Sequence, residues 1–427
     1  MHPGVGPASG VARDPAATQP FHDPLELRLD RAPGSLTLPP HEVPAIIMQE
    51  GQIGAGHEAG NIVAPGPVCL PYVMTSTDQS ALPLETALTA LEQGRDLTAD
   101  QAAGAFGVVM RGEATTDQIK ALLLGLRAKG ETFEEIAGAA QALRQAMITV
   151  RPSAGSPIVD TCGTGGGQVG TFNISTAAGF VVAAAGVRVA KHGNRSYTSK
   201  CGSADVLEAL GVDITVAPDR IATLLDHAGM AFLFAPNFHP AMRHVGPVRK
   251  ELGVATVMNL LGPLANPAGV TRQVIGVADR ARACRIAQAV GRLGADHVLV
   301  VHAELGMDEI SPVGPTHVWE VRNNTVTTWV IQPAEHDQAW ERAEDLAGGD
   351  PRENAARIER LLGGSASGEN DEAGRRAVVL NAAGGLYVAG VVETYGDGIK
   401  LADRVLADGR AGVVLERLRE RAGRSDG

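Results

Sequence analysis

The sequence predicts an α/β protein with a small N-terminal all-helical domain and a larger domain with a mostly parallel sheet flanked by helices. Two observations support this class. Apolar residues recur at three- and four-residue spacing between Pro83 and Thr149, a pattern typical of amphipathic helices. From Pro157 onward, short apolar segments alternate with helical ones, and strands that are apolar on both faces belong to parallel sheets covered by helices.

The first 78 residues differ from the rest of the chain. They are rich in Pro and Gly, and no apolar period is sustained along them. This composition is typical of a disordered leader. Met74 stands just before the first periodic segment, so a start of translation at Met74 is a second interpretation of the same stretch.

Residues 79–150 make up the predicted helical domain. Thr98 and Thr115 precede its second and third periodic segments, where a hydroxyl accepts hydrogen bonds from the unpaired N–H groups of a first turn. We expect helices at 84–91, 102–110, 119–126 and 136–147.

The remainder of the chain is divided by its short apolar runs. We expect strands at 158–160, 187–190, 212–216, 230–234, 272–277 and 297–301, and helices at 176–185, 204–210, 220–227 and 281–293. The runs 318–321 and 326–331 flank Asn323 and Asn324 and predict a hairpin. A Gly- and Ser-rich loop at 363–372 precedes helical segments at 377–389 and 398–418.

Composition excludes several classes of function. The formal net charge is −11 and no stretch concentrates Lys and Arg, which disfavours a nucleic-acid partner. The four cysteines are scattered without a CxxC pair, so neither a disulfide framework nor a zinc site is expected. No charge-free apolar run reaches the roughly 20 residues that span a bilayer, and no secretory signal is visible. We expect a cytoplasmic protein with no membrane contact.

A glycine-rich turn lies between a predicted strand and a predicted helix. Its glycines permit positive φ and let backbone N–H groups approach an anion; they are Gly163, Gly165, Gly166 and Gly167. The helix opens with Asn173, Ser175 and Thr176, where unpaired N–H groups and the helix dipole favour phosphate. Neither a GK[ST] ending nor the dinucleotide GxGxxG pattern with an acidic residue about 20 positions on is present. A phosphate site is predicted, and a capped structural turn is the alternative.

A cationic stretch follows the apolar run 187–190. Lys191, Arg195 and Lys200 alternate with hydroxyl side chains at the carboxyl end of a strand, where open α/β sheets bind ligands. This pattern suits a ligand with several phosphates, and a solvated loop is the alternative. His192, taken alone, is more typical of a packing or capping residue than of a catalytic base.

Two further groups carry possible chemistry. Asp308 and Glu309 follow the strand at 297–301 and can hold Mg²⁺, which prefers oxygen ligands; an exposed acidic turn is the alternative. Arg243, Arg249 and Lys250 lie among Pro- and Gly-rich stretches. A guanidinium that reaches the site would bind a carboxylate substrate in bidentate fashion, although from composition alone each arginine is more often a surface charge.

From about Leu82 to the C-terminus the motifs TFNIST, KHGNR, GSAD, HPAMRHV, NLLGPLANP and GMDE resemble the anthranilate phosphoribosyltransferase family in order and spacing. The resemblance implies a fold of the nucleoside phosphorylase/phosphoribosyltransferase type. Its helical domain would take a later contribution from about 237–267, and residues 151–427 would form the α/β domain. It also implies a homodimer that pairs through the helical domain.

The resemblance further implies transfer of a phosphoribosyl group from 5-phosphoribosyl 1-pyrophosphate (PRPP) to the amine of anthranilate in tryptophan biosynthesis, with two Mg²⁺ ions per subunit. The positions that match the family's PRPP site are Gly163, Gly166, Gly167, Thr171, Asn173, Ile174, Ser175, Thr176, Lys191, His192, Gly193, Asn194, Arg195, Ser196, Tyr197, Thr198, Ser199 and Ser203. Gly163, Asn194 and Arg249 match the anthranilate contacts, and Ser175, Asp308 and Glu309 match the metal ligands. His192 matches a histidine close to the anthranilate path and is a possible catalytic residue.

The chain departs from the family pattern in two places. Gly167 stands where the family usually has Asp, so a carboxylate near the metal-bound substrate is absent. Tyr197, Thr198 and Cys201 lie in a stretch that usually carries more serines; Thr198 keeps a hydroxyl, whereas Cys201 gives up a good donor. A pyrimidine nucleoside phosphorylase is the nearest rival interpretation, but it would have no need of the acidic pair Asp308-Glu309. A second rival interpretation is a non-catalytic relative that binds nucleic acid. It would require a basic surface, and the net charge of −11 argues against it.

Overall fold

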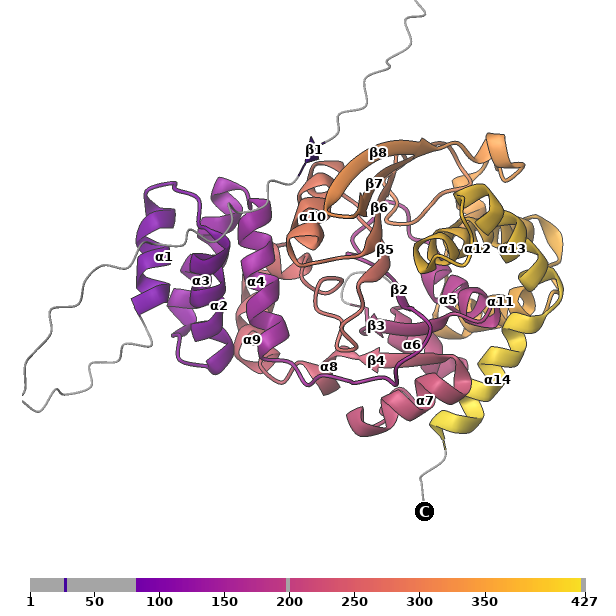
Figure 1. Cartoon of the computed structure of the whole chain (residues 1–427), viewed down its shortest axis with the longest axis horizontal. Helices are drawn as coiled ribbons and strands as arrows, with labels where there is room; N and C mark the ends of the chain where they lie inside the picture. The colour runs from indigo at the N-terminus through magenta and orange to yellow at the C-terminus, as the bar shows by residue number, and fades with distance from the viewer. Residues whose placement is uncertain (1–26, 29–81, 197–199, 424–427) are drawn as a thin grey trace, which may run out of the picture.

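The computed structural model describes residues 27–28, 82–196 and 200–423 of the chain (Figure 1). The predicted disordered leader, residues 1–78, lies outside the described residues except for Leu27 and Arg28. No helix among the described residues is long and apolar enough to cross a membrane.

The described residues 82–145 form four helices, which confirms that prediction. They are α1 (Leu82–Glu92), α2 (Ala99–Arg111), α3 (Thr116–Lys129) and α4 (Phe133–Gln145). Thr98, Thr115 and Thr132 each form a capping box with the third residue of the helix that follows, so the start of each of these helices is encoded locally.

The other described residues are built around one sheet that contains both parallel and antiparallel strands. Its strands are β1 (Leu27–Arg28), β2 (Ile158–Gly163), β3 (Arg188–Gly193), β4 (Met230–Phe234), β5 (Arg272–Gly276), β6 (His297–Ala303), β7 (Thr316–Arg322) and β8 (Thr325–Ile331), in the order β1-β8-β7-β6-β5-β2-β3-β4. The pairs from β6 to β4 are parallel, whereas β7 and β8 form the predicted antiparallel hairpin. Asn323 and Asn324 turn it with φ of 52° and 59°.

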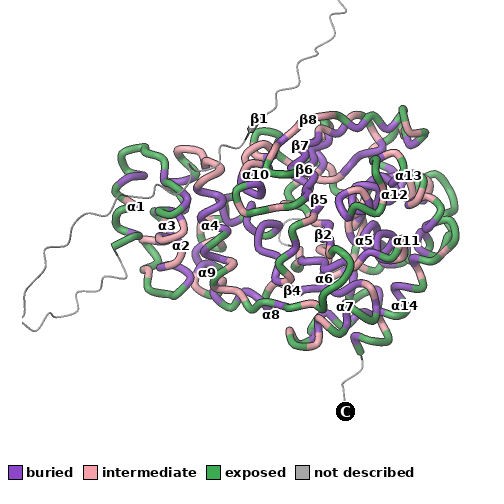
Figure 2. Tube along the Cα trace, in the orientation of Figure 1, coloured by how far each residue is buried: buried purple, intermediate pink, exposed green. Residues whose placement is uncertain are grey.

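Helices cover both faces of this sheet (Figure 1). On one side lie α5 (Ile174–Ala184), α11 (Pro351–Leu362), α12 (Gly368–Ala389), α13 (Tyr395–Ala407) and α14 (Arg410–Ala422), and on the other α10 (Arg280–Arg292) packs between the sheet and α4. The sheet separates two apolar cores. In β6, Leu299 and Val301 belong to the core beneath α5 and α12, and Val298 and Val300 belong to the core that extends into helices α1 to α4. The central strands are accordingly buried on both sides (Figure 2).

Shorter elements complete the fold. They are α6 (Ser203–Ala209), α7 (Ile221–Ala228), α8 (Ala235–Phe238), α9 (Met242–Leu252) and the 3₁₀ turns at Pro218–Arg220, Val257–Asn259, Pro333–His336 and Ala343–Leu346. Helix α9 packs against α2 and α3, although about a hundred residues separate them in the sequence.

Two predictions of local structure are wrong. The run 212–216 is not a strand: Val212, Ile214 and Val216 are buried, but the side chain of Asp213 accepts hydrogen bonds from Thr215 and the segment turns without joining the sheet. The loop expected at 363–372 ends earlier, because α12 begins at Gly368. The first turns of α12 are strongly charged, so they lack the apolar period that reveals the rest of the helix.

Candidate active site

The glycine-rich turn lies directly over the acidic pair. Gly165 and Gly166 have φ of +69° and +80°, which confirms the positive φ expected of them, whereas Gly163 and Gly167 do not need it. The Gly165 N–H donates to Oδ2 of Asp308 at 2.8 Å. A Cβ at position 163 would come within 2.7 Å of that same carboxylate oxygen, so a larger residue there would displace the Asp308 side chain.

The start of α5 faces the second carboxylate. The Ser175 N–H, in the first turn of the helix, donates to Oε1 of Glu309 at 3.1 Å. Asn173 makes no side-chain cap and instead donates to the carbonyl of Cys201 at 3.2 Å. The hydroxyl of Thr176 is buried without a hydrogen-bond partner in the described structure. The α5 start therefore offers N–H groups to an anionic oxygen, as the sequence predicts.

Lys191 lies at the end of β3 with a side chain that is 2% exposed. Its ammonium donates to the carbonyl of Thr161 and lies 3.4 Å from the Ser175 hydroxyl. Beneath it, burial raises the pKa of Asp160, and the charge of Lys191 partly offsets that rise. Asn266 donates to Asp160 at 2.8 Å and to the carbonyl of Ala190 at 2.8 Å. Through these two hydrogen bonds Asn266 connects β2, which carries Asp160, to β3, which carries Ala190.

Asp308 and Glu309 form a half-buried acidic pair. Burial raises the pKa of both side chains, and for Glu309 the neighbouring charge of Asp308 raises it further, to about 8. Neither carboxylate belongs to an ion pair found among the described residues. Two adjacent carboxylates with the Ser175 hydroxyl nearby make an oxygen-only donor set, and a divalent cation would offset their mutual repulsion. The residues therefore fit Mg²⁺ with part of its shell left to water and phosphate.

His192 and His239 form a buried pair with tilted rings. Their Nε2 atoms lie 3.2 Å apart, and Nδ1 of His192 lies 3.1 Å from the carbonyl of Gly262. Since that carbonyl accepts, His192 carries its proton on Nδ1, and its Nε2 must accept from His239. Burial lowers the pKa of His192 to about 3 and that of His239 to about 4. His192 is thus neutral, and the lone pair on its Nε2 atom accepts the hydrogen bond from His239.

This pair predicts an acid-sensitive stability. The unfolded histidines bind protons below their ordinary pKa of about 6.5, whereas the folded pair stays neutral, so stability is lost as pH falls from there toward 4. Between about pH 7 and pH 5, His239→Asn should reduce this loss by about 2 kcal/mol in urea unfolding. Parallel curves for the variant and the wild type would contradict the buried neutral pair.

Arg195 is directed away from the acidic pair. Its guanidinium binds Glu208 at 2.5 and 2.8 Å and Asp205 at 3.0 Å, both on α6. Its own N–H donates to the Asn194 side chain at 2.7 Å. The side chain of Arg195 therefore shapes the stretch after β3, and its guanidinium reaches a substrate only if those bonds rearrange.

The other candidates fall into three groups. Gly193 ends β3, Asn194 and Ser196 follow it, and Ser203 begins α6, whereas Tyr197, Thr198 and Ser199 lie outside the described residues. Gly167, Thr171 and Ile174 flank the start of α5. Arg249 occupies the last turn of α9 and is half-buried, so it comes from the helical side of the molecule.

Position 167 bears directly on the acidic pair. A Cβ there would lie 3.2 Å from Oδ1 of Asp308 and 3.2 Å from the carbonyl of Gly306. An Asp at this position would therefore place a third carboxylate beside Asp308. Because this third carboxylate is absent, Asp308 and Glu309 experience less electrostatic repulsion. The glycine-rich turn is held to Asp308 by the Gly165 N–H.

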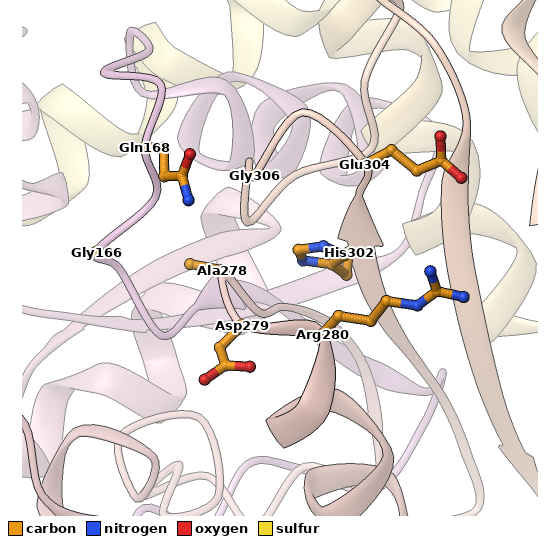
Figure 3. A pocket seen from close by; sticks show the side chains of 8 residues that line it. All are labelled: Gly166, Gln168, Ala278, Asp279, Arg280, His302, Glu304 and Gly306. Carbon is orange, nitrogen blue, oxygen red and sulfur yellow. The ribbon is translucent and has the colours of Figure 1, made fainter.

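A polar cavity of about 460 Å³ opens beside the glycine-rich turn (Figure 3). Gln168 reaches toward it from the turn, and His302 projects into it from the end of β6. Its lining residues are Gly166, Gln168, Ala278, Asp279, Arg280, His302, Glu304 and Gly306. Sequence reasoning missed Gln168, as it missed Asp160, His239 and Asn266, because each acts through a neighbour that only folding brings close.

Comparison with known proteins agrees with this geometry. Residues 155–412 match the glycosyl transferase family, a/b domain, and residues 85–147 match the glycosyl transferase family, helical bundle domain. Anthranilate phosphoribosyltransferase 2 of Streptomyces coelicolor is 49% identical over 323 residues, which cover 76% of this chain and 95% of that protein.

Solved structures give the same result. Anthranilate phosphoribosyltransferase from Thermus thermophilus superposes with a TM-score of 0.74 at 43% identity, covering 79% of this chain and 99% of that one. The Saccharomyces cerevisiae enzyme in complex with PRPP and Mg gives 0.73 at 27% identity, covering 80% and 98%. With its helical bundle, its parallel sheet and these relatives, the chain belongs to the anthranilate phosphoribosyltransferase family.

Proposed function

We propose that the protein transfers the phosphoribosyl group of PRPP to the amine of anthranilate, giving N-(5-phosphoribosyl)anthranilate and pyrophosphate, in tryptophan biosynthesis. The observation that carries the proposal is the half-buried pair Asp308-Glu309, which meets the glycine-rich turn and the first turn of α5. A site with two adjacent carboxylates between two anion-binding turns suits a metal-bound polyphosphate. The relatives named for this activity support it.

PRPP would bind at the carboxyl ends of β2 and β3. Backbone N–H groups of the turn and the start of α5 would hold its phosphate oxygens, and Lys191 would add a positive charge close to Ser175. The remaining contacts that we propose come from the family's positions in the turn 163–167, the α5 start 171–176, the stretch 191–199 and Ser203.

Mg²⁺ would be held by Ser175, Asp308 and Glu309, and the yeast structure with PRPP and Mg supports this choice of ion. We propose two ions per subunit. When bound, Mg²⁺ stabilises the negative charge that grows on pyrophosphate as it leaves. The chain's own part is to present both carboxylates from the turn that follows β6.

Anthranilate would enter from the helical side, with its carboxylate on Arg249 and further contacts to Gly163 and Asn194. Arg249 would orient the amine for attack on the ribose C1 atom, opposite the leaving pyrophosphate. The amine nitrogen becomes strongly acidic once it has bonded to the ribose C1 atom, so no powerful base is required to remove its proton. The buried neutral pair His192–His239 agrees with that, and we assign no general base.

We further propose the domain division 79–150 with a contribution from 237–267, then 151–427, and a cytoplasmic homodimer. Apolar side chains exposed on the helical side support self-association: Leu82, Leu124 and Val254 are 59%, 41% and 42% exposed. Free thiols at Cys162, Cys201 and Cys284 agree with a reducing compartment. Light scattering of the purified protein tests the dimer.

The test of function is the fluorescence of anthranilate. Its signal should fall when enzyme, PRPP and Mg²⁺ are combined, and should stay constant when PRPP is omitted or the metal is chelated. Phosphate-dependent cleavage of a pyrimidine nucleoside, with no loss of anthranilate, would overturn the proposal in favour of a phosphorylase.

A further inference from the structure

A chain of three hydrogen bonds links α11 to the predicted PRPP site. The Gly349 N–H donates to Oδ1 of Asn354 at 2.8 Å, and Nδ2 of Asn354 donates to Oδ1 of Asn173 at 3.0 Å. Nδ2 of Asn173 then donates to the carbonyl of Cys201 at 3.2 Å. Asn354 is 3% exposed, so water does not compete for these bonds.

The direction of this chain is fixed at both ends by backbone groups. Gly349 can only donate through its N–H, so the oxygen of the Asn354 carboxamide must face it and its NH₂ must face Asn173. The carbonyl of Cys201 can only accept, so the NH₂ of Asn173 must face Cys201. The two carboxamides therefore have one consistent orientation, and Asn354 sets that of Asn173.

Cys201 in turn supports the stretch that follows β3. Gly202 lies so close to this stretch that a Cβ there would come within 2.3 Å of the Ser196 nitrogen. The Ala204 N–H donates to the carbonyl of Asn194 at 3.2 Å, and the Ser196 and Gly202 N–H groups share one oxygen of Asp205. The backbone of Asn194 and Ser196 is thereby tied to residues 201–205.

Other contacts hold α11 and the segment before it in place without Asn354. In that segment, backbone bonds run from Phe172 to Leu346 at 3.1 Å and from Gly348 to Gly170 at 3.0 Å. The guanidinium of Arg357 lies 4.2 Å from the centre of the Phe172 ring. Loss of the Asn354 carboxamide should therefore break the polar chain while α11 stays docked.

We propose that Asn354 is a positioning residue for the phosphoribosyl donor. Through Asn173 it holds Cys201 and, with it, the backbone of residues 194–196 in the geometry that receives PRPP. This inference rests on the proposed function, because it concerns the donor site of that reaction. Asn354 lies on α11, about 180 residues from Asn173 in the sequence, and acts without touching the substrate.

Calorimetric titration of the full-length enzyme with Mg²⁺ and PRPP tests this role. Asn354→Leu, which is similar in volume and cannot form hydrogen bonds, should raise the Kd for PRPP about tenfold, as expected for loss of a buried polar link. KM for PRPP should rise with it, and KM for anthranilate should stay near the wild-type value. Ile358→Val, on the same helix and fully buried, is the matched control and should leave the Kd unchanged.

A double-mutant cycle separates positioning from general destabilisation. If Asn354 acts through Asn173, then Asn354→Leu should add nothing further to the Kd in an Asn173→Ala background. Additive losses, or an unchanged Kd in Asn354→Leu, would refute the inference. Asn354→Ser, which cannot reach Asn173, answers the same question if Asn354→Leu does not fold. A wild-type protein that does not bind PRPP would instead refute the proposed function.

Discussion

Asp308→Asn combined with Glu309→Gln should abolish magnesium-dependent transfer, with kcat/KM lower by about 10³-fold or more, because the metal contributes several kcal/mol of charge stabilisation. No third acidic, His or Cys side chain joins Asp308 and Glu309 in a metal-binding group among the described residues, so no neighbour can take over from the neutral amides. The fold should persist, since the repulsion within the pair is relieved. Initial rates at a series of Mg²⁺ concentrations measure the effect, and circular dichroism checks the fold.

The control for this variant removes the same two charges elsewhere. Glu416→Gln with Glu420→Gln, both exposed on α14, should leave the rate and its Mg²⁺ dependence as in the wild type. If the Asp308/Glu309 variant responds to Mg²⁺ as the wild type does, the metal site lies elsewhere.

Arg249→Ala should lower kcat/KM for anthranilate about 100-fold, because a bidentate bond between a guanidinium and a carboxylate contributes about 3 kcal/mol when shielded from water. The Kd for PRPP should change little, since PRPP is proposed to bind at the strand ends of the other region. Arg249→Lys should give an intermediate loss, because an ammonium keeps the charge without the planar fork. Steady-state kinetics with each substrate varied in turn measure this.

Lys250→Ala provides the comparison for Arg249. Lys250 is the next residue of the same last turn and is exposed, so its removal takes away an equal charge without the proposed contact. Its kinetic constants should match those of the wild type. Equal losses for both substrates in Arg249→Ala would show that the residue stabilises the site as a whole and does not recognise anthranilate.

Local chemistry made much of the fold predictable. The helix starts at Thr98 and Thr115 were found because a capping residue acts on the turn beside it. Strands β4 to β6 were found because strands buried on both faces are mostly apolar. The run 212–216 alternates apolar and polar residues but pairs with no strand among the described residues, and a strand cannot exist without a partner for its backbone.

Helices α9 and α11 escaped prediction for different reasons. Pro247 lies inside α9, where a helix is not expected from local propensity, and packing against α2 and α3 stabilises it. Helix α11 carries local signals that the sequence analysis did not use: Asp350 caps it, Pro351 opens it, and its buried apolar residues recur at three- and four-residue spacing. Only α9 depends on distant contacts to outweigh its local propensity.

The site divides in the same way. The sequence was enough to place the glycine-rich turn, Lys191 and the pair Asp308-Glu309 at one edge, because the carboxyl ends of parallel strands meet there. It did not reveal the neutral pair His192–His239 or the engagement of Arg195 with α6, because protonation and pairing depend on burial and on partners far along the chain. Asn354 is the clearest such case: nothing in its neighbourhood marks it, and its meaning comes from a hydrogen bond to Asn173 that exists only once α11 packs against the start of α5.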